Sequence, residues 1–247
     1  MMNVMQKDGK YIIRAKNKRF PRWTAIDLIL HSLRLEPATI TYFWDAEQKE
    51  QIELIKNIYG DLPWSTSLAE AYQVHTAVLA TQKIPGDLAE VGVFRGGSAK
   101  IISKSRNKGK ALHLFDTFGE GLPEPDEKFD SPNFKKGGFN ISETEFENIK
   151  KRFHNESNVF FYPGVFPTTA TPIKNTRFSF VNLDVDIYSS TRDCLSFFYE
   201  KMNRGGIILS HDYNGALGVK KAFDEFFRDK PEPMIKLSTS QCLVVKI

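Results

Sequence analysis

Short apolar runs and amphipathic stretches alternate along the chain from residue 84 onward. The apolar runs are typical of buried parallel strands, and the stretches between them carry apolar residues at helical spacing. The strands expected from this pattern are 87–93, 111–116, 159–162, 178–184 and 206–210. The helices expected between and after them are 98–105, 142–153, 189–203 and 219–228. Such alternation predicts a doubly wound, Rossmann-like α/β sheet.

Both ends of the chain depart from this alternation. Two further strands are expected at 234–237 and 242–247, too close together for a crossover, so they should form an antiparallel hairpin that closes the sheet. Before residue 84 the apolar spacing predicts helices at 24–35, 47–59 and 65–82. The sequence therefore predicts a basic arm and helical cap over 1–83 and the α/β domain over 84–247.

Composition excludes several classes of protein. The chain has 247 residues and a net charge of +4, and its 41% hydrophobic content is enough for a packed core. Much of the basic excess lies before residue 23, where interleaved Tyr11, Ile12 and Ile13 suit a surface strand better than a nucleic-acid contact. Two cysteines do not make a disulfide scaffold, and no apolar run reaches the roughly 20 residues of a membrane span. With no signal peptide evident, we expect a cytoplasmic protein without nucleic-acid or membrane partners.

Acidic residues gather where two expected strands end. Asp184 and Asp186 follow the strand 178–184, and His211 and Asp212 follow the strand 206–210. A right-handed crossover brings the carboxyl ends of both strands to the same edge of the sheet. Three carboxylates and an imidazole there indicate a metal or acid–base site. The alternative, that the acids only cap the next elements, is less favoured for a cluster of this size.

A glycine-rich turn, residues 92–98, joins the first strand of the α/β domain to its helix. Glycines at 92 and 96 keep the turn free of Cβ atoms, so a nucleotide-like ligand can approach the backbone. Glu90 lies on the strand before the turn, and Asp116 at the next strand end is placed to accept ribose hydroxyls. The turn lacks the G-x-G-x-x-G spacing of a dehydrogenase, which disfavours an NAD-dependent oxidoreductase.

Four segments in this order resemble the macrocin O-methyltransferase (TylF-type) family of class I S-adenosylmethionine-dependent methyltransferases: GDLAEVGVFRGGSA, LFDTFGEGLP, DVDIYSST and GGIILSHDY. The resemblance covers about residues 64–247. It implies that S-adenosylmethionine is the cofactor, with Glu90, Gly92 and Gly96 along its methionine part and Asp116 on its ribose. We also expect cofactor contacts from Phe94, Arg95, Ser98 and Gly164.

The resemblance also implies chemistry at the acidic edge. In the family, an acid in the position of Asp184 and an acidic pair after the fifth strand hold Mg²⁺. Asp186 is similar to the acid proposed there as general base. Known members methylate sugar hydroxyls of natural products, so the expected partner is a small-molecule acceptor such as a glycoside. The long polar segment 117–141 is expected to be a lid over this acceptor.

One position departs from the family pattern. The chain has His211-Asp212-Tyr213 where the characterised sugar methyltransferases have Asp-Asp-Tyr. Imidazole is a poor ligand for Mg²⁺, which prefers oxygen. Three alternatives remain: His211 points away, another divalent ion binds, or no metal binds and His211 is the base. A divalent metal held by Asp184, His211 and Asp212 is preferred, with Mg²⁺ the expected ion, because both carboxylates remain.

Two other functions are weighed against methyl transfer. A protein that binds S-adenosylmethionine without transferring its methyl group would need neither Asp184 nor Asp186. A nucleic-acid methyltransferase is disfavoured because DVDIY stands where amino-methylating DNA enzymes have a tetrapeptide like N-P-P-Y. The expected helical cap with Trp44 and Trp64 leads us to expect a homo-oligomer, a dimer or larger.

Overall fold

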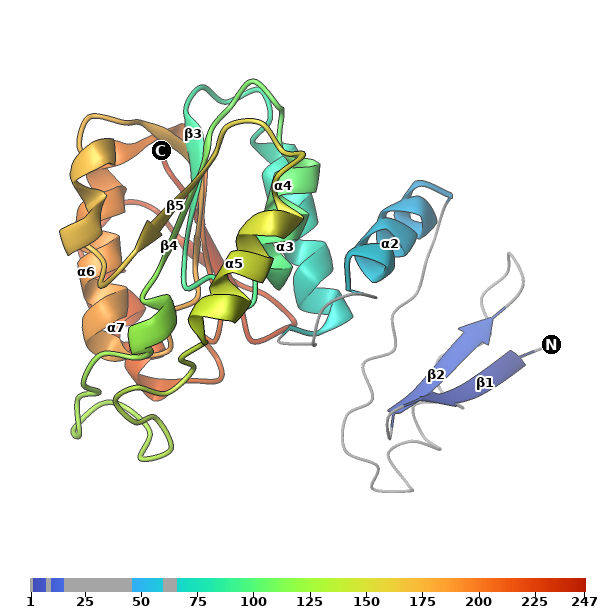
Figure 1. The fold of residues 1–247 in the computed structure, drawn as a ribbon, viewed down its shortest axis with the longest axis horizontal. Helices are drawn as coiled ribbons and strands as arrows, with labels where there is room; N and C mark the ends of the chain where they lie inside the picture. The colour runs from blue at the N-terminus through green and yellow to red at the C-terminus, as the bar shows by residue number, and fades with distance from the viewer. Residues whose placement is uncertain (1, 8–9, 16–45, 60–65) are drawn as a thin grey trace. The chain divides into compact units, whose positions relative to one another are not determined.

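The computed structural model describes residues 2–7, 10–15, 46–59 and 66–247 (Figure 1). The chain divides into two compact units, 1–49 and 50–247. The first contains an antiparallel strand pair, β1 (Met2–Lys7) and β2 (Lys10–Ala15). The helix expected at 24–35 and the interface residues Trp44 and Trp64 lie outside the described residues.

The second unit is built on a seven-stranded sheet in the order β5-β4-β3-β6-β7-β9-β8. The neighbours from β5 to β7 pair in parallel, and β9 pairs antiparallel with both β7 and β8. The predicted Rossmann-like sheet and its closing hairpin are confirmed. The strands are β3 (Asp87–Val91), β4 (Leu112–Asp116), β5 (Val159–Pro163), β6 (Phe178–Leu183), β7 (Met202–Ser210), β8 (Met234–Lys236) and β9 (Cys242–Val245).

Helices cover both faces of this sheet (Figure 1). Side chains of α3, α4 and α5 pack in one buried cluster with strand residues such as Leu114, and side chains of α6 and α7 pack in another with residues such as Phe178. The helices are α2 (Ala46–Tyr59), α3 (Leu68–Ala80), α4 (Gly97–Ser105), α5 (Glu143–Arg152), α6 (Tyr188–Phe198) and α7 (Leu217–Phe227). Short 3₁₀ turns are η1 (Phe118–Glu120), η2 (Thr168–Ile173) and η3 (Tyr199–Lys201). In the part of the chain described, no helix is both long and apolar enough to cross a bilayer.

The helix expected over 189–203 is wrong at its C-terminal end. Helix α6 ends at Phe198, and β7 begins at Met202, so the glycine pair 205–206 lies inside a strand. Between the pairs Phe178–Met202 and Phe180–Ile207 the strand β6 advances two residues while β7 advances five. Gly205, with φ of 83°, lies in this bulge. The glycines therefore accommodate an irregular strand rather than end a helix.

Candidate active site

The acids expected to meet at the carboxyl edge lie together. Asp184 directly follows β6 and its backbone N–H donates to Val91 O at 2.9 Å, while His211 follows β7 and donates to Leu183 O at 2.8 Å. These bonds continue the parallel pairing past the strand ends. As a result, His211 Nδ1 lies 3.2 Å from Asp184 Oδ1 and 2.9 Å from Asp212 Oδ2.

The other ring nitrogen of His211 faces helix α3. Its Nε2 is 2.9 Å from Thr66 Oγ1 and 3.8 Å from Glu70 Oε2. Glu70 is fixed by the capping box that starts α3, where Ser67 N donates to Glu70 Oε2 at 2.8 Å. Neither Thr66 nor Glu70 was expected at the site. The capping-box spacing was visible in the sequence, but nothing in it places these residues beside His211.

His211 is surrounded by negative charge. Burial lowers the pKa of its imidazole, but the carboxylates of Asp184 and Asp212 outweigh this effect and raise the pKa to about 12. With such a pKa the ring is a cation at neutral pH, and its Nδ1–H faces the carboxylates of Asp184 and Asp212. When the ring is deprotonated, Nδ1 is a free nitrogen ligand in the same place.

Asp186 projects into the same cluster from a tight turn. Its φ is 60°, and Ile187 N donates to Val185 O across it at 2.6 Å. Burial and the charges of Asp184 and Asp212 raise the pKa of the Asp186 carboxyl to about 8, although His211 lowers it. A carboxyl with such a pKa exchanges protons near neutral pH, as a general base requires.

The cluster fits a divalent metal. Asp184, His211 and Asp212 each offer one ligand atom, and these atoms lie within 4.8 Å of one another. Two carboxylates and one imidazole form a mixed donor set. Oxygen-only sets suit Mg²⁺, and imidazole shifts the preference towards transition metals such as Mn²⁺ and, more strongly, Zn²⁺. The residues present therefore fit a transition-metal ion better than Mg²⁺.

The glycine-rich turn is joined to this cluster through its backbone. Gly92 has φ of 91°, and a Cβ atom there would overlap the backbone oxygen of Asp184. Gly96 has φ of 83° and is the N-cap of α4. Gly92 must therefore lack a side chain because the backbone of Asp184, just after β6, lies against it. This close contact fixes the turn and the acidic cluster relative to each other.

Asp116 holds the turn in shape. Its Oδ2 accepts from Val93 N at 2.7 Å and from Phe94 N at 2.8 Å, and its Oδ1 accepts from Phe118 N at 2.5 Å. Burial raises the pKa of this carboxyl, although the three backbone N–H groups lower it. A carboxylate has about four acceptor positions, so capacity for a ribose hydroxyl remains. The ribose role of Asp116 stays a prediction.

Glu90 and Asn182 face each other on neighbouring strands. Glu90 is fully buried, and its Oε1 accepts from Asn182 Nδ2 at 2.7 Å. Glu90 Oε2 and Asn182 Oδ1 are buried acceptors without a hydrogen-bond partner. Burial raises the pKa of Glu90 to about 8, although Ser98 and Asn182 lower it. Asn182 was missed in the sequence, although a polar residue in the apolar run FSFVNL was a visible signal.

The remaining predicted cofactor residues surround the turn. Arg95 pairs with Glu145 at 3.3 Å, and its guanidinium lies 5.0 Å from the ring of Phe94. Ser98 is buried in the first turn of α4. Gly164 has φ of 123° and donates its N–H to Asp116 O at 2.9 Å. Their contacts with a cofactor stay predictions.

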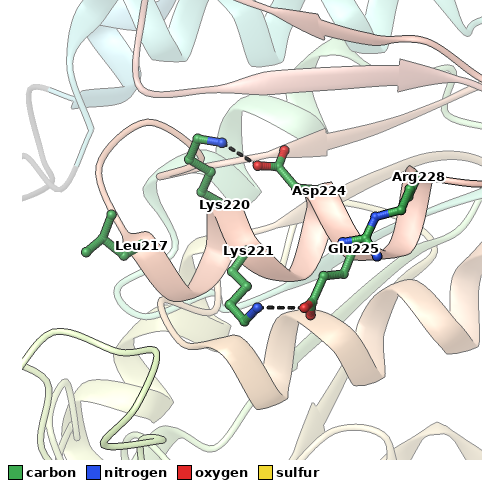
Figure 2. A pocket seen from close by; sticks show the side chains of 6 residues that line it. All are labelled: Leu217, Lys220, Lys221, Asp224, Glu225 and Arg228. Atoms are coloured by element: carbon green, nitrogen blue, oxygen red, sulfur yellow. Dashed lines mark hydrogen bonds and ion pairs between the residues drawn. The ribbon is translucent and has the colours of Figure 1, made fainter.

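An open pocket lies along the outer side of α7, apart from the residues described above (Figure 2). Its lysines are paired within the helix, Lys220 with Asp224 and Lys221 with Glu225. Because these charges are paired four residues apart on one exposed helix, we assign the pocket no role in the chemistry. It is lined by Leu217, Lys220, Lys221, Asp224, Glu225 and Arg228.

Substitution of Gly92 tests the link between the turn and the acidic cluster. The Gly92→Ala variant should lose several kcal/mol of unfolding free energy, because its Cβ meets backbone that cannot move cheaply. Gly119→Ala is the matched control, since a Cβ there lies 3.9 Å from its nearest neighbour. Urea denaturation of both variants measures the effect. Equal midpoints for the two variants would contradict the account.

The sequence of this chain is similar to those of two O-methyltransferases from Streptomyces. The Demethyldecarbamoylnovobiocin O-methyltransferase of Streptomyces niveus is 28% identical over 154 residues, which is 58% of each protein. The 8-demethyl-8-(2,3-dimethoxy-alpha-L-rhamnosyl)-tetracenomycin-C 4'-O-methyltransferase of Streptomyces olivaceus is 27% identical over 165 residues, 58% of this chain and 63% of the relative. The matches thus span about three fifths of the length of these relatives.

Solved structures share the fold. The O-methyltransferase NovP superposes with a TM-score of 0.60 at 23% identity, covering 73% of this chain and 80% of NovP. The calicheamicin methyltransferase CalS11 superposes with a TM-score of 0.65 at 15% identity, covering 83% and 94%. The sequence model of the Macrocin-O-methyltransferase (TylF) family matches residues 67–242, which is more than half of the chain. This chain therefore belongs to the macrocin O-methyltransferase (TylF) family.

Proposed function

We propose that this protein is an S-adenosylmethionine-dependent O-methyltransferase that acts on a sugar hydroxyl of a small molecule. The observation that carries the proposal is the fixed junction between the glycine-rich turn and the acidic cluster at Gly92 and Asp184. It places a candidate cofactor site and a candidate proton acceptor at one sheet edge. The name of the Streptomyces olivaceus relative specifies the 4'-oxygen of a rhamnosyl compound, which supports a glycoside acceptor.

Two unpaired acceptor atoms, on Glu90 of β3 and Asn182 of β6, could bind the ammonium group of the cofactor. Glu90 Oε2 and Asn182 Oδ1 have no hydrogen-bond partner within the protein, and buried polar groups are nearly always hydrogen-bonded. An ammonium group, such as the one on the methionine part of S-adenosylmethionine, would supply the missing donors. When bound, the cofactor supplies an electrophilic methyl group on its sulfonium. Asp116 keeps the turn in the conformation that receives it.

Asp186 is the base that the geometry favours. With a metal held by Asp184, His211 and Asp212, the ring nitrogen of His211 would be taken up as a ligand, whereas Asp186 is not a member of the ligand set. The positive charge of the ion would favour the ionised form of the Asp186 carboxyl, which can accept a proton. Asp186 would take the proton of the acceptor hydroxyl as the oxygen attacks the methyl carbon. The rest of the acceleration comes from alignment of the acceptor and exclusion of water by the protein.

The metal belongs to the acceptor side of the site. Asp184, His211 and Asp212 would hold a divalent ion, which would supply Lewis-acid polarisation of the acceptor oxygen. The tight turn over 184–187 keeps Asp186 beside these ligands. The hydrogen bond between Thr66 Oγ1 and His211 Nε2 fixes the orientation of the ring, so that Nδ1 points towards the two carboxylates.

Transfer of a labelled methyl group tests the proposal. The protein is incubated with methyl-deuterated S-adenosylmethionine, Mn²⁺ and a panel of rhamnosyl and other deoxysugar glycosides. We expect one labelled methyl group on a sugar oxygen and an equal amount of S-adenosylhomocysteine. Methylation of nitrogen or carbon in place of oxygen would contradict the proposal, as would consumption of a nicotinamide cofactor.

The donor set makes a prediction about the metal. In the His211→Asp variant a third carboxylate replaces the imidazole. The ratio of kcat/KM with Mg²⁺ to kcat/KM with Mn²⁺ should therefore rise at least about tenfold. His154→Asp, at an exposed helix end, is the control and should leave the ratio unchanged. The ratio of kcat/KM with the two ions measures the effect. An unchanged ratio in His211→Asp would mean that His211 is not a ligand.

A further inference from the structure

The segment expected to be a lid is fixed by a single carboxylate. We propose that Asp130 is a positioning residue that ties the segment 117–141 to the starts of helices α6 and α7, and so builds the wall of the site that receives the acceptor. The proposal rests on the function proposed above for this site. It assigns a role to a residue that lies outside the acidic cluster and outside the glycine-rich turn.

Asp130 is buried although it belongs to a polar loop. It is 8% exposed, and both of its oxygens are used: Oδ1 accepts from Tyr188 N and Oδ2 accepts from Asp126 N, each at 2.8 Å. Asp126 O in turn accepts from Phe129 N at 3.0 Å and Asp130 N at 2.8 Å. The loop therefore forms a closed turn around Asp130 and presents its carboxylate to the helices.

The two helices lack caps of their own. Their N-cap residues are Ile187 for α6 and Ala216 for α7, and neither side chain can accept a hydrogen bond. Ser189 and Ser190 are the nearby residues with capping side chains, but both lie inside the helix. Asp130 instead accepts from the first N–H of α6, one of the N–H groups that have no partner within the helix.

The same carboxylate lies against α7. A Cβ atom at Gly218 would overlap Asp130 Oδ1 and lie 3.0 Å from Tyr188 N. Glycine disfavours a helix by about 1 kcal/mol relative to alanine, and here it leaves the space that Asp130 occupies. Asp130 therefore contacts both helix starts at once.

These helix starts carry the acids of the site. Tyr188 comes two residues after Asp186, and Gly218 comes six residues after Asp212, whose backbone oxygen accepts from Ala216 N at 2.7 Å. Asp130 thus bridges the segments that follow β6 and β7. The loop therefore lies beside the two chain segments that lead directly out of the acidic cluster.

Aromatic contacts extend the docking beyond the carboxylate. The ring of Phe129 lies 4.7 Å from the ring of Tyr188, and Lys221 Nζ lies 4.5 Å from the centre of the Phe129 ring. The loop is therefore held across the boundary between α6 and α7. The hydrogen bonds of the Asp130 carboxylate go to Tyr188 N and Asp126 N, and neither residue is among those proposed to contact the cofactor.

This arrangement predicts a separation between acceptor and cofactor. In Asp130→Ala the loop loses its anchor, so KM for the acceptor should rise at least about tenfold, since both hydrogen bonds of the carboxylate are lost. The Kd of S-adenosylmethionine should stay within about twofold. Asp130→Asn keeps Oδ1 as an acceptor for Tyr188 N and should recover part of the loss.

Two further variants keep the test independent of a folding defect. Gly218→Ala pushes the carboxylate away from the α7 side while it improves helix propensity, so it should reproduce the effect of Asp130→Ala. Glu124→Ala removes an exposed acid from the same loop and should change nothing. Hydrogen exchange of residues 122–138 is measured in the same variants, and it reports docking even if the wild-type protein transfers no methyl group.

We expect faster exchange over 122–138 in Asp130→Ala and Gly218→Ala only, together with the rise in acceptor KM. Unchanged exchange in both Asp130→Ala and Gly218→Ala would overturn the proposal, and so would an equal loss of affinity for acceptor and S-adenosylmethionine. Faster exchange with no methyl transfer in the wild-type protein would refute the proposed function and the role of the loop in acceptor binding, while the docking by Asp130 would stand.

Discussion

Asp186→Asn should lower kcat for methyl transfer by about 10³-fold, within the range that general bases contribute. Asparagine keeps the size of the side chain and its place in the turn over 184–187, but it cannot accept a proton. The affinity for S-adenosylmethionine should stay within about twofold, because the orphaned acceptors of Glu90 and Asn182 are untouched. Steady-state kinetics at saturating acceptor, together with calorimetric titration of the cofactor, measures both quantities.

The control for this variant is Asp229→Asn, an exposed acid just beyond α7. It makes the same acid-to-amide substitution away from the site and should leave kcat unaltered. If Asp186→Asn kept kcat within about tenfold of the wild type, Asp186 would not be the base. If it lost cofactor binding as well, the effect would be structural and the assignment would fail for a different reason.

Glu90→Gln should weaken S-adenosylmethionine binding by about 10- to 100-fold, because a charge-assisted hydrogen bond to the cofactor is lost. The same change should stabilise the cofactor-free protein. Glu90 is fully buried and its pKa is raised to about 8 from its ordinary 4.5, so the folded state holds a proton that the unfolded state has already released. Glutamine carries no such proton and resembles the neutral acid in shape.

The sign of the pH dependence follows from this difference. Between pH 4.5 and about 8 the unfolded wild-type protein binds fewer protons at this group than the folded protein, so stability falls as pH rises and then levels off. Glu90→Gln should therefore match the wild type near pH 5 and exceed it by a few kcal/mol at pH 8. Thermal and urea unfolding of the cofactor-free proteins across this range measures the gap. A gap that does not grow with pH would contradict the buried, protonated Glu90, and Glu143→Gln on the surface of α5 should show none.

The positions of the strands along the chain could be predicted because a buried parallel strand is a short, continuous run of apolar residues. The run at Phe178–Leu183 is apolar, and the helices between such runs fix parallel pairing through the crossover rule. The same rule brings Asp184 and Asp212 to one edge. What the pattern does not contain is irregular backbone: the bulge at Gly205 starts β7 earlier than an apolar run can indicate.

Long-range side-chain contacts were not predictable in the same way. Thr66 and His211 are 145 positions apart and meet only because α3 packs on the sheet. Asp130 caps α6 across 58 positions, so a search for a cap among the residues next to the helix finds serines that do not serve. Asp116 was expected on a ribose, and its bonds to the backbone of the turn show a structural use that sequence spacing cannot reveal.

The most direct test of the central claim is calorimetric titration of S-adenosylmethionine into the purified protein, with Mn²⁺ and again after chelation. We expect saturable binding at one site per chain under both conditions, because none of the residues proposed to contact the cofactor is among the candidate metal ligands Asp184, His211 and Asp212. Binding should weaken in Glu90→Gln and stay unchanged in Asp186→Asn. If no saturable binding is seen under either condition, the account is contradicted, and the acidic cluster has no role in methyl transfer from S-adenosylmethionine.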